Sequence, residues 1–286
     1  MILTTMNLQI SSDTFYTAKY INSVKKKETA YYAGKSAVDS VRDYVKKGYS
    51  SDPKELYDYL KYIESTPLNL NTGDVKVSIE IQDLEKKFSI NSIENNDNLE
   101  YLKRIFTEIG LSSSNIPKIA DWIDKDDNSR VDGNEYSLKY GTVKNAPIDS
   151  LNELNWIDSF KDDIKDFKEN KVEGAGNLEN YLTSYGLSYD KININTASRV
   201  LLKSLTDDLT EQEVDEIIKN RPIKNKYDLG DILGGQDSPK LYKIEKVAGY
   251  ISRYFEIKAT AVYDEETLII KTVVDKDGKI LFWGVE

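Results

Sequence analysis

Apolar residues near the start of the chain lie three or four positions apart, which is the spacing of one face of an α-helix. They are Ala30, Ala33, Ala37, Val41 and Val45, with basic residues between them. A second helix is expected from Asp52, because an Asp cap, a Pro at the first helical position and Glu55 three residues after the cap mark a helix start. The N-terminal region is therefore predicted to form two helices, the first of them long.

The apolar period changes to two in two separate regions, which is typical of half-buried strands. Residues 75–82 alternate apolar and polar side chains, and residues 88–90 follow after a turn, so a hairpin is predicted there. Near the C-terminus, residues 255–261 and 268–274 show the same alternation, and a turn leads to residues 279–283. This second region predicts a β-meander.

The region between residues 92 and 250 returns to the helical period in short segments. Thr210 with Glu213 has the capping-box spacing, and Ser238 precedes Pro239, as at many helix starts. The apolar positions that define these helices are Leu99, Leu102, Ile105 and Ile109; Ile116, Ile119 and Ile123; Phe160, Ile164 and Phe167; Val200, Leu201 and Leu205; Val214, Ile217 and Ile218; and Leu241, Ile244, Val247 and Ile251. An all-α region is predicted.

The order of these elements predicts an α+β fold in which one antiparallel sheet is interrupted by a helical domain. An isolated hairpin is only marginally stable, so two short β regions far apart in sequence are expected to share one sheet. The predicted parts are residues 1–91 with the long helix and first strands, an inserted helical domain over 92–250, and the last strands over 251–286. The first helix is expected to pack on the sheet.

Two short sequences within the insert resemble each other. Residues 89–92 (SINS) precede one set of helices and residues 193–196 (NINT) precede another. Each set later reaches a similar helix start, at residues 149–154 and 227–232. The insert is either two related halves or a chance similarity of short polar and apolar segments.

The composition excludes several classes of function. The 286 residues include 39 Lys and Arg against 49 Asp and Glu, a formal charge of −10, so a phosphate backbone is repelled on average. Without Cys or His there are no thiol nucleophiles, zinc sites of those residues, Ser-His-Asp triads or imidazole acid–base groups. Any metal must be held by oxygen atoms, and the redox compartment stays open.

No stretch of the sequence approaches the roughly 18–20 apolar residues that a membrane-spanning helix needs. The first six residues also lack the basic start and apolar core of a signal peptide. The chain is therefore expected to be either cytosolic or an exported protein whose targeting segment is missing from this sequence.

The most specific chemical pattern is an acidic loop of twelve residues, 124–135. Its oxygen-bearing side chains at positions one, three, five, nine and twelve are Asp124, Asp126, Asn128, Asp132 and Glu135. This is the ligand spacing of an EF-hand calcium loop, in which Arg130 at position seven would offer only its backbone carbonyl. The glycine of an EF-hand is absent at position six, so a different chain trace is expected around similar calcium ligands.

Two other interpretations of the acidic loop fit its residues less well. A solvated acidic turn needs no metal, but so many carboxylates beside a single Arg repel each other unless a cation is present. A glycosidase-type pair of carboxylates needs one acid in an apolar setting and an aromatic sugar platform, and the sequence shows neither. Calcium binding is therefore the preferred prediction.

Four ordered motifs with compatible spacing are together more specific than any one of them alone. They are residues 121–126 (DWIDKD) followed by 133–136 (GNEY); 145–154 (NAPIDSLNEL); 181–186 (YLTSYG); and 193–197 (NINTA). Through these motifs the sequence resembles the minor pseudopilin of type II secretion known as general secretion pathway protein K. The likeness is weakest in the first helix and the final strands.

The resemblance implies a pseudopilin fold, a long N-terminal helix on a small antiparallel sheet with a large inserted helical domain. It implies a non-catalytic tip component of a periplasmic pseudopilus, in complex with minor pseudopilins I and J, with the secreted substrate and the outer-membrane secretin as further contacts. The full-length protein would be bacterial and anchored in the inner membrane by a segment absent here, so that this sequence begins within the first helix.

The same resemblance implies calcium in the inserted domain. Carried over by motif, Asp124, Asp126 and Glu135 are the first ligand candidates, followed by Asp121, Asp127, Asn128 and Asp132. Family members often have acids after the Glu-x-Tyr element, whereas Ser137 and Leu138 stand here, so a second metal is not expected.

Two alternative functions remain at this point. A minor pilin of a type IV pilus shares the helix and sheet but usually lacks the helical insert. A helix-hairpin-helix DNA-binding module is suggested by residues 193–197 followed by 209–220, but such a hairpin presents Gly-hydrophobic-Gly amides to phosphate. Residues 205–209 have no Gly and contain Asp207 and Asp208, so no nucleic-acid partner is expected.

Overall fold

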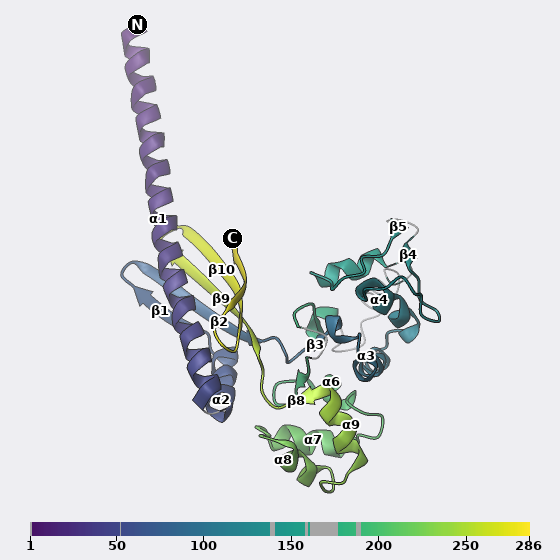
Figure 1. Ribbon diagram of the computed structural model, residues 1–286. Coiled ribbons are helices and arrows are strands. Elements are labelled where there is room, and N and C mark those ends of the chain that lie inside the picture. The colour runs from purple at the N-terminus through teal and green to yellow at the C-terminus, as the bar shows by residue number, and fades with distance from the viewer. Residues whose placement is uncertain (1, 52, 138–140, 158–159, 161–176, 187–189) are drawn as a thin grey trace. The chain divides into compact units, whose positions relative to one another are not determined.

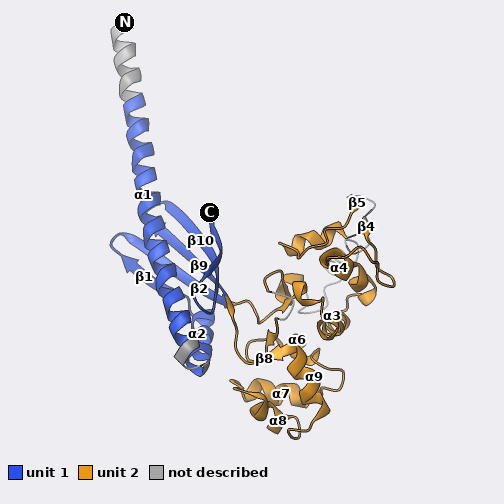
Figure 2. Cartoon of the chain, viewed as in Figure 1, with its two compact units in different colours: residues 1–82, 255–286 blue, residues 83–254 orange. Residues whose placement is uncertain are grey.

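The computed structural model describes residues 2–51, 53–137, 141–157, 160, 177–186 and 190–286. The chain divides into two compact units, shown in different colours in Figure 2. The sheet unit consists of residues 1–82 and 255–286, and the inserted unit of residues 83–254. The insert thus covers residues 83–254, whereas the sequence pattern predicts 92–250.

The sheet unit joins the two ends of the chain (Figure 1). Its helices are α1 (Ile2–Ser51) and α2 (Pro53–Ser65), and its strands are β1 (Leu68–Thr72), β2 (Val75–Asp83), β9 (Tyr254–Tyr263), β10 (Glu266–Asp275) and β11 (Ile280–Val285). These strands form one five-stranded sheet in the order β1-β2-β9-β10-β11. The prediction of a single sheet that the insert interrupts, with a C-terminal meander, is confirmed.

The core of the sheet unit lies between α1, α2 and one face of the sheet. The apolar stripe of α1 is buried, with Ala30, Val38 and Val45 fully covered. Strand β2 alternates buried and accessible residues along its length, which is the period that identified it in the sequence. Ile257 and Ile270 complete the same cluster from β9 and β10, so burial of apolar surface holds the helix on the sheet.

The predicted hairpin between residues 75–82 and 88–90 is wrong. β2 pairs with β1, antiparallel, with Leu68 opposite Ile79 and Thr72 opposite Val75. Residues 88–89 form β3 (Phe88–Ser89) in the inserted unit, parallel to β6 (Leu182–Thr183). β1 was not predicted because its Asn and Thr residues are exposed, so the sequence shows no clear alternation of buried and exposed residues there.

Helices are the main regular elements that the structure describes in the inserted unit. Its α-helices are α3 (Asn96–Glu108), α4 (Ile116–Ile123), α6 (Arg199–Lys203), α7 (Glu211–Lys219), α8 (Lys226–Ile232) and α9 (Pro239–Val247). Its short 3-10 helices are η1 (Ile90–Ser92), η2 (Ser113–Asn115), η3 (Leu151–Trp156) and η4 (Leu178–Asn180). Its further strands are β4 (Tyr136–Ser137), β5 (Gly141–Thr142), β7 (Ile192–Asn193) and β8 (Ala248–Gly249). The capping box of Thr210 and Glu213 is present at the start of α7.

The all-α prediction for this unit is therefore incomplete, because β3–β6, β4–β5 and β7–β8 are pairs of two-residue strands. Strands of two residues cannot show an apolar period, so the sequence could not reveal them. Of the predicted helix at Phe160, Ile164 and Phe167, the last two residues lie outside the described residues, as does Leu138.

In the second half of the inserted unit, one buried side chain joins segments that are far apart in the sequence. Asn195, 4% exposed, donates from Nδ2 to the carbonyls of Ile223 and Tyr250, both at 2.8 Å. Its Oδ1 accepts the Ile223 N–H at 2.7 Å. One amide thus joins the residue that follows Pro222 to the residue that follows strand β8.

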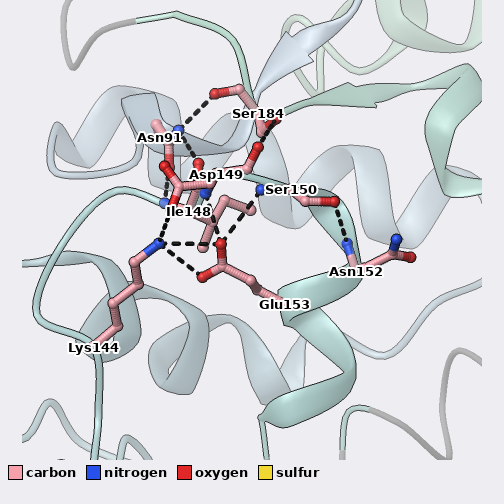
Figure 3. A network of polar contacts seen from close by, with 8 residues as sticks. All are labelled: Asn91, Lys144, Ile148, Asp149, Ser150, Asn152, Glu153 and Ser184. Atoms are coloured by element: carbon pink, nitrogen blue, oxygen red, sulfur yellow. Dashed lines mark hydrogen bonds and ion pairs between the residues drawn. The ribbon is translucent and has the colours of Figure 1, made fainter. Parts of the chain in front are cut away.

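The first half repeats this arrangement (Figure 3). Asn91 donates from Nδ2 to the carbonyls of Ile148 at 3.0 Å and Ser184 at 2.7 Å, and its Oδ1 accepts the Ile148 N–H at 2.8 Å. Ile148 follows Pro147 as Ile223 follows Pro222, and Ser184 follows strand β6 as Tyr250 follows β8. The similar sequences at 89–92 and 193–196 therefore occupy equivalent places in two similar halves.

The structure aligns the helix starts of the two halves differently from the alignment predicted from the sequence. Ser150 caps η3 and Asn225 caps α8, each accepting a backbone N–H two residues on. Each cap lies three residues after the proline, which makes residues 149–154 equivalent to 224–229, not 227–232. The short apolar and acidic segments match in both alignments, so only the shared cap and proline identify the correct one.

The two chain crossings into the insert lie side by side at its ends. The Leu84 N–H donates to the Tyr254 carbonyl at 3.0 Å, and Ser252 Oγ donates to Asp83 Oδ2 at 2.5 Å. Arg253 Nη2 pairs with Glu85 Oε1 at 2.7 Å and Asp190 Oδ1 at 2.6 Å. The inserted unit therefore begins and ends at nearly the same point.

Among the described residues, no helix combines the length and the apolar character that crossing a bilayer requires.

Candidate metal centre

Helix α4 places two buried carboxylates at its C-terminal end. The α4 sequence IPKIADWI buries Ile116, Ile119 and Ile123, and this packing also carries Asp121 inward, where its side chain is fully covered. Asp124 follows as the C-cap, with its side chain 9% exposed. Helix packing thus positions two acids at the start of the acidic loop.

The loop returns and brings a third carboxylate, Glu135, to the same place. One oxygen from each of Asp121, Asp124 and Glu135 lies within 4.8 Å of the others. Calcium binds oxygen at 2.3–2.6 Å, so two of its ligands can be at most about 5 Å apart. The three side chains are therefore close enough to share one such ion.

Several oxygens in this cluster have no hydrogen-bond partner. Asp124 Oδ1 and both carboxylate oxygens of Glu135 are buried without one. Burial, followed by the charges of Asp121 and Asp124, raises the pKa of Glu135 to about 7. Buried oxygens that lack donors cost free energy unless a proton or a cation satisfies them, so the donor set fits a hard divalent cation.

Arg130 supplies the positive charge that this structure shows in the cluster. Its Nη1 lies 2.9 Å from Asp121 Oδ1 and also contacts Asp124 Oδ2. Its backbone N–H points at both Asp121 oxygens, at 3.2 and 3.3 Å. Burial lowers the pKa of Arg130, but hydrogen bonds and charge interactions with Asp124 and Asp121 outweigh it and raise that pKa above its ordinary value.

The path of the loop differs from an EF-hand, as the missing glycine predicts. The left-handed residue is Asp132, with φ 64°, and the carbonyl of Arg130 accepts the Gly133 N–H at 2.9 Å. A Cβ on Gly133 would lie 1.9 Å from Asp121 Oδ2. Gly133 is therefore required because the backbone passes directly over the buried carboxylate.

The remaining predicted ligands lie elsewhere in the loop. Asp126 Oδ1 accepts from the backbone and side-chain nitrogens of Asn128, at 2.9 and 2.8 Å. Asp127 Oδ1 accepts from Asn145 Nδ2 at 2.7 Å, and Asp132 is exposed. The structure thus brings together Asp121, Asp124 and Glu135, and the wider ligand set stays a prediction.

A polar network that is not predicted from the sequence joins Lys144 to the start of η3 (Figure 3). Lys144 Nζ lies 3.0 Å from both oxygens of buried Glu153 and 2.8 Å from Asp149 Oδ2. Glu153 Oε1 also accepts the backbone N–H groups of Asp149 and Ser150. The Ser-x-x-Glu spacing of residues 150–153 is the capping-box signal that could have identified it.

Residues 205–209, the hairpin considered for DNA binding, make contacts within the chain. Arg104 donates to the carbonyls of Ser204 and Leu205, at 2.7 and 2.9 Å. Asp208 pairs with Lys243 at 2.6 Å, so part of the hairpin's acidic surface is neutralised within the chain. The hairpin has no Gly and carries two acids, so nucleic-acid binding is not favoured.

Comparison with known proteins gives a match to a family model and matches to solved structures. Residues 192–245 match the family model of type II secretion system (T2SS) protein K. The fold is similar to a chain of the GspK-GspI-GspJ complex from the enterotoxigenic Escherichia coli type 2 secretion system, with a TM-score of 0.61 and 13% identity over 96% of this chain and 99% of that one. No curated protein matches this sequence.

The matched segment is the second half of the inserted unit and includes Asn195, whereas the structural likeness extends over nearly the whole chain. At 13% identity the structural match establishes the fold. The structural match confirms the predicted α+β fold, and the family model over residues 192–245 confirms the resemblance of this chain to the type II secretion protein K family.

Proposed function

We propose that this chain is a minor pseudopilin of type II secretion that acts, without catalysis, at the tip of the pseudopilus. The observation that carries this proposal is a match to the protein K family model at residues 192–245, within a fold similar to a chain of the GspK-GspI-GspJ complex over 96% of this chain. A type IV minor pilin is less favoured because it would not need the insert of residues 83–254. The proposed setting is the periplasmic side of a bacterial inner membrane, with the protein anchored in that membrane.

The proposed partners are minor pseudopilins corresponding to the I and J components of that complex. The test mixes this protein with the periplasmic domains of the I and J candidates from the same organism and measures mass by light scattering across gel-filtration peaks. A ternary peak with one copy of each is expected. If I and J pair with each other while this chain elutes alone, the proposal is wrong.

We also propose that the cluster of Asp121, Asp124 and Glu135 holds calcium. Support comes from the three converging carboxylates, from the buried oxygens without partners, and from the backbone that passes over Asp121 at Gly133. Bound calcium would supply positive charge to these oxygens. The residues themselves would join the end of α4 to the returning loop, a structural role.

Calcium is expected to raise the melting temperature, because a ligand that binds only the folded protein stabilises it. At one hundred times its dissociation constant the gain is about 2.7 kcal/mol, or roughly 5–10 °C for a chain of this size. Asp124→Ala with Glu135→Ala should abolish the shift. Glu108→Ala with Asp207→Ala removes two exposed acids from the same unit and should retain it. An equal shift in both double variants would contradict the assignment.

A further inference from the structure

The position of Arg130 in the acidic cluster has a consequence for how the cluster takes up a cation. We propose that Arg130 is a built-in counter-cation, which holds the metal-free cluster together and has to leave before a divalent cation can bind. This inference rests on the calcium proposal and adds a residue that lowers the affinity of the site.

The guanidinium contacts carboxylate oxygens that a metal would need. Nη1 lies between Asp121 Oδ1, at 2.9 Å, and Asp124 Oδ2. A divalent cation at ligand distance from these oxygens would be within a few ångströms of Nη1, where two positive charges repel strongly. The two occupants therefore exclude each other.

The Arg130 side chain can move away from the carboxylates without disturbing the rest of the cluster. Its side chain is 34% exposed, whereas that of Asp121 is fully buried. The long side chain can rotate into solvent, while the Arg130 backbone N–H keeps its contact with the Asp121 carboxylate. Asp121 therefore stays oriented in both states.

The three carboxylates also favour a divalent cation over the Arg130 guanidinium. Nη1 reaches Asp121 and Asp124, while both Glu135 oxygens lack a hydrogen-bond donor. One guanidinium compensates one of three negative charges, whereas a divalent cation compensates two and can use all three carboxylates. Arg130 is thus an adequate but replaceable counter-cation.

The test measures calcium binding to chelator-treated full-length chain by titration calorimetry, for wild type, Arg130→Gln and Lys125→Gln. Lys125 is an exposed cation of the same loop, so its variant makes the same charge change. Arg130→Gln is expected to tighten calcium binding about tenfold, and Lys125→Gln at most about threefold, since exposed charges are screened. In chelator, Arg130→Gln should melt below wild type, and in saturating calcium the difference should disappear.

The outcomes separate the two proposals. Weaker binding by Arg130→Gln, or a gain no larger than that of Lys125→Gln, would overturn the counter-cation role while calcium binding stands. Binding by Arg130→Gln alone would support the role strongly, because Arg130 would then block the site in wild type. No binding by any of the three proteins would remove the calcium proposal and this inference together.

Discussion

Replacing Asn195 with Ala tests whether this buried amide stabilises the second half of the inserted unit. The substitution removes three hydrogen bonds, two to the carbonyls of Ile223 and Tyr250 and one from the Ile223 N–H. All three backbone groups are then left without the partner that the side chain supplied.

The expected loss is about 3–5 kcal/mol, because each hydrogen bond contributes about 1 kcal/mol net and an unsatisfied buried group costs about 1–3 kcal/mol. Each 1.4 kcal/mol is a factor of ten, so the Ile223 amide should exchange hydrogen at least about 100-fold faster in native-state measurements. Asn91→Ala should have the same effect on the Ile148 amide and leave that of Ile223 much less affected, because each Asn fastens its own half.

Asn152→Ala is the matched control, because this exposed side chain lies in the same unit and should change stability by less than about 0.5 kcal/mol. Exchange of Ile223 that accelerates less than fivefold in Asn195→Ala would refute the reasoning. The amide would then not be a fastening of that half.

Two further predictions concern Gly133 and two acids with raised pKa values, Glu135 and Glu85. Gly133→Ala should abolish calcium stabilisation in thermal melts, because the new Cβ would lie 1.9 Å from Asp121 Oδ2, whereas Gly249→Ala, whose nearest neighbour is 3.7 Å away, should not. In chelator, the melting temperature should fall as pH rises from about 5 to 8. Burial raises the pKa values of Glu135 and Glu85 to about 7, so between the unfolded value near 4.5 and 7 the folded state binds more protons and deprotonation destabilises it. Glu135→Gln should reduce this slope, and an unchanged slope would assign it to other groups.

The parts of the fold that the sequence predicts are those in which burial follows a simple period. The stripe of α1 and the alternation of β2 and β9 are buried on one side, so composition and packing agree. The exposed β1 and the two-residue strands of the insert depend on contacts between residues far apart in sequence. Local pattern contains no information about such pairings, which is why the hairpin prediction failed.

The acidic site shows the same division. Asp124 and Glu135 were identified from loop spacing, and Asp121 from the family motif alone, because a buried acid on an apolar helix has no spacing signal of its own. Asp126 and Asn128 have ligand-type side chains at suitable positions, yet they bond each other. Spacing selects residue types, while the turn at Arg130 to Gly133 decides which of them converge.

The adjacent ends of the inserted unit affect how the sheet can form. Strands β2 and β9 are neighbours in the sheet, although the whole insert separates them along the chain. Closing so long a loop while it is disordered has an entropic cost, and pairings of this kind slow folding. Once residues 83–254 have folded, the contact between Leu84 and Tyr254 brings the two strands together like the turn of a hairpin. During synthesis the insert can therefore fold first and act as the nucleus on which the sheet is completed.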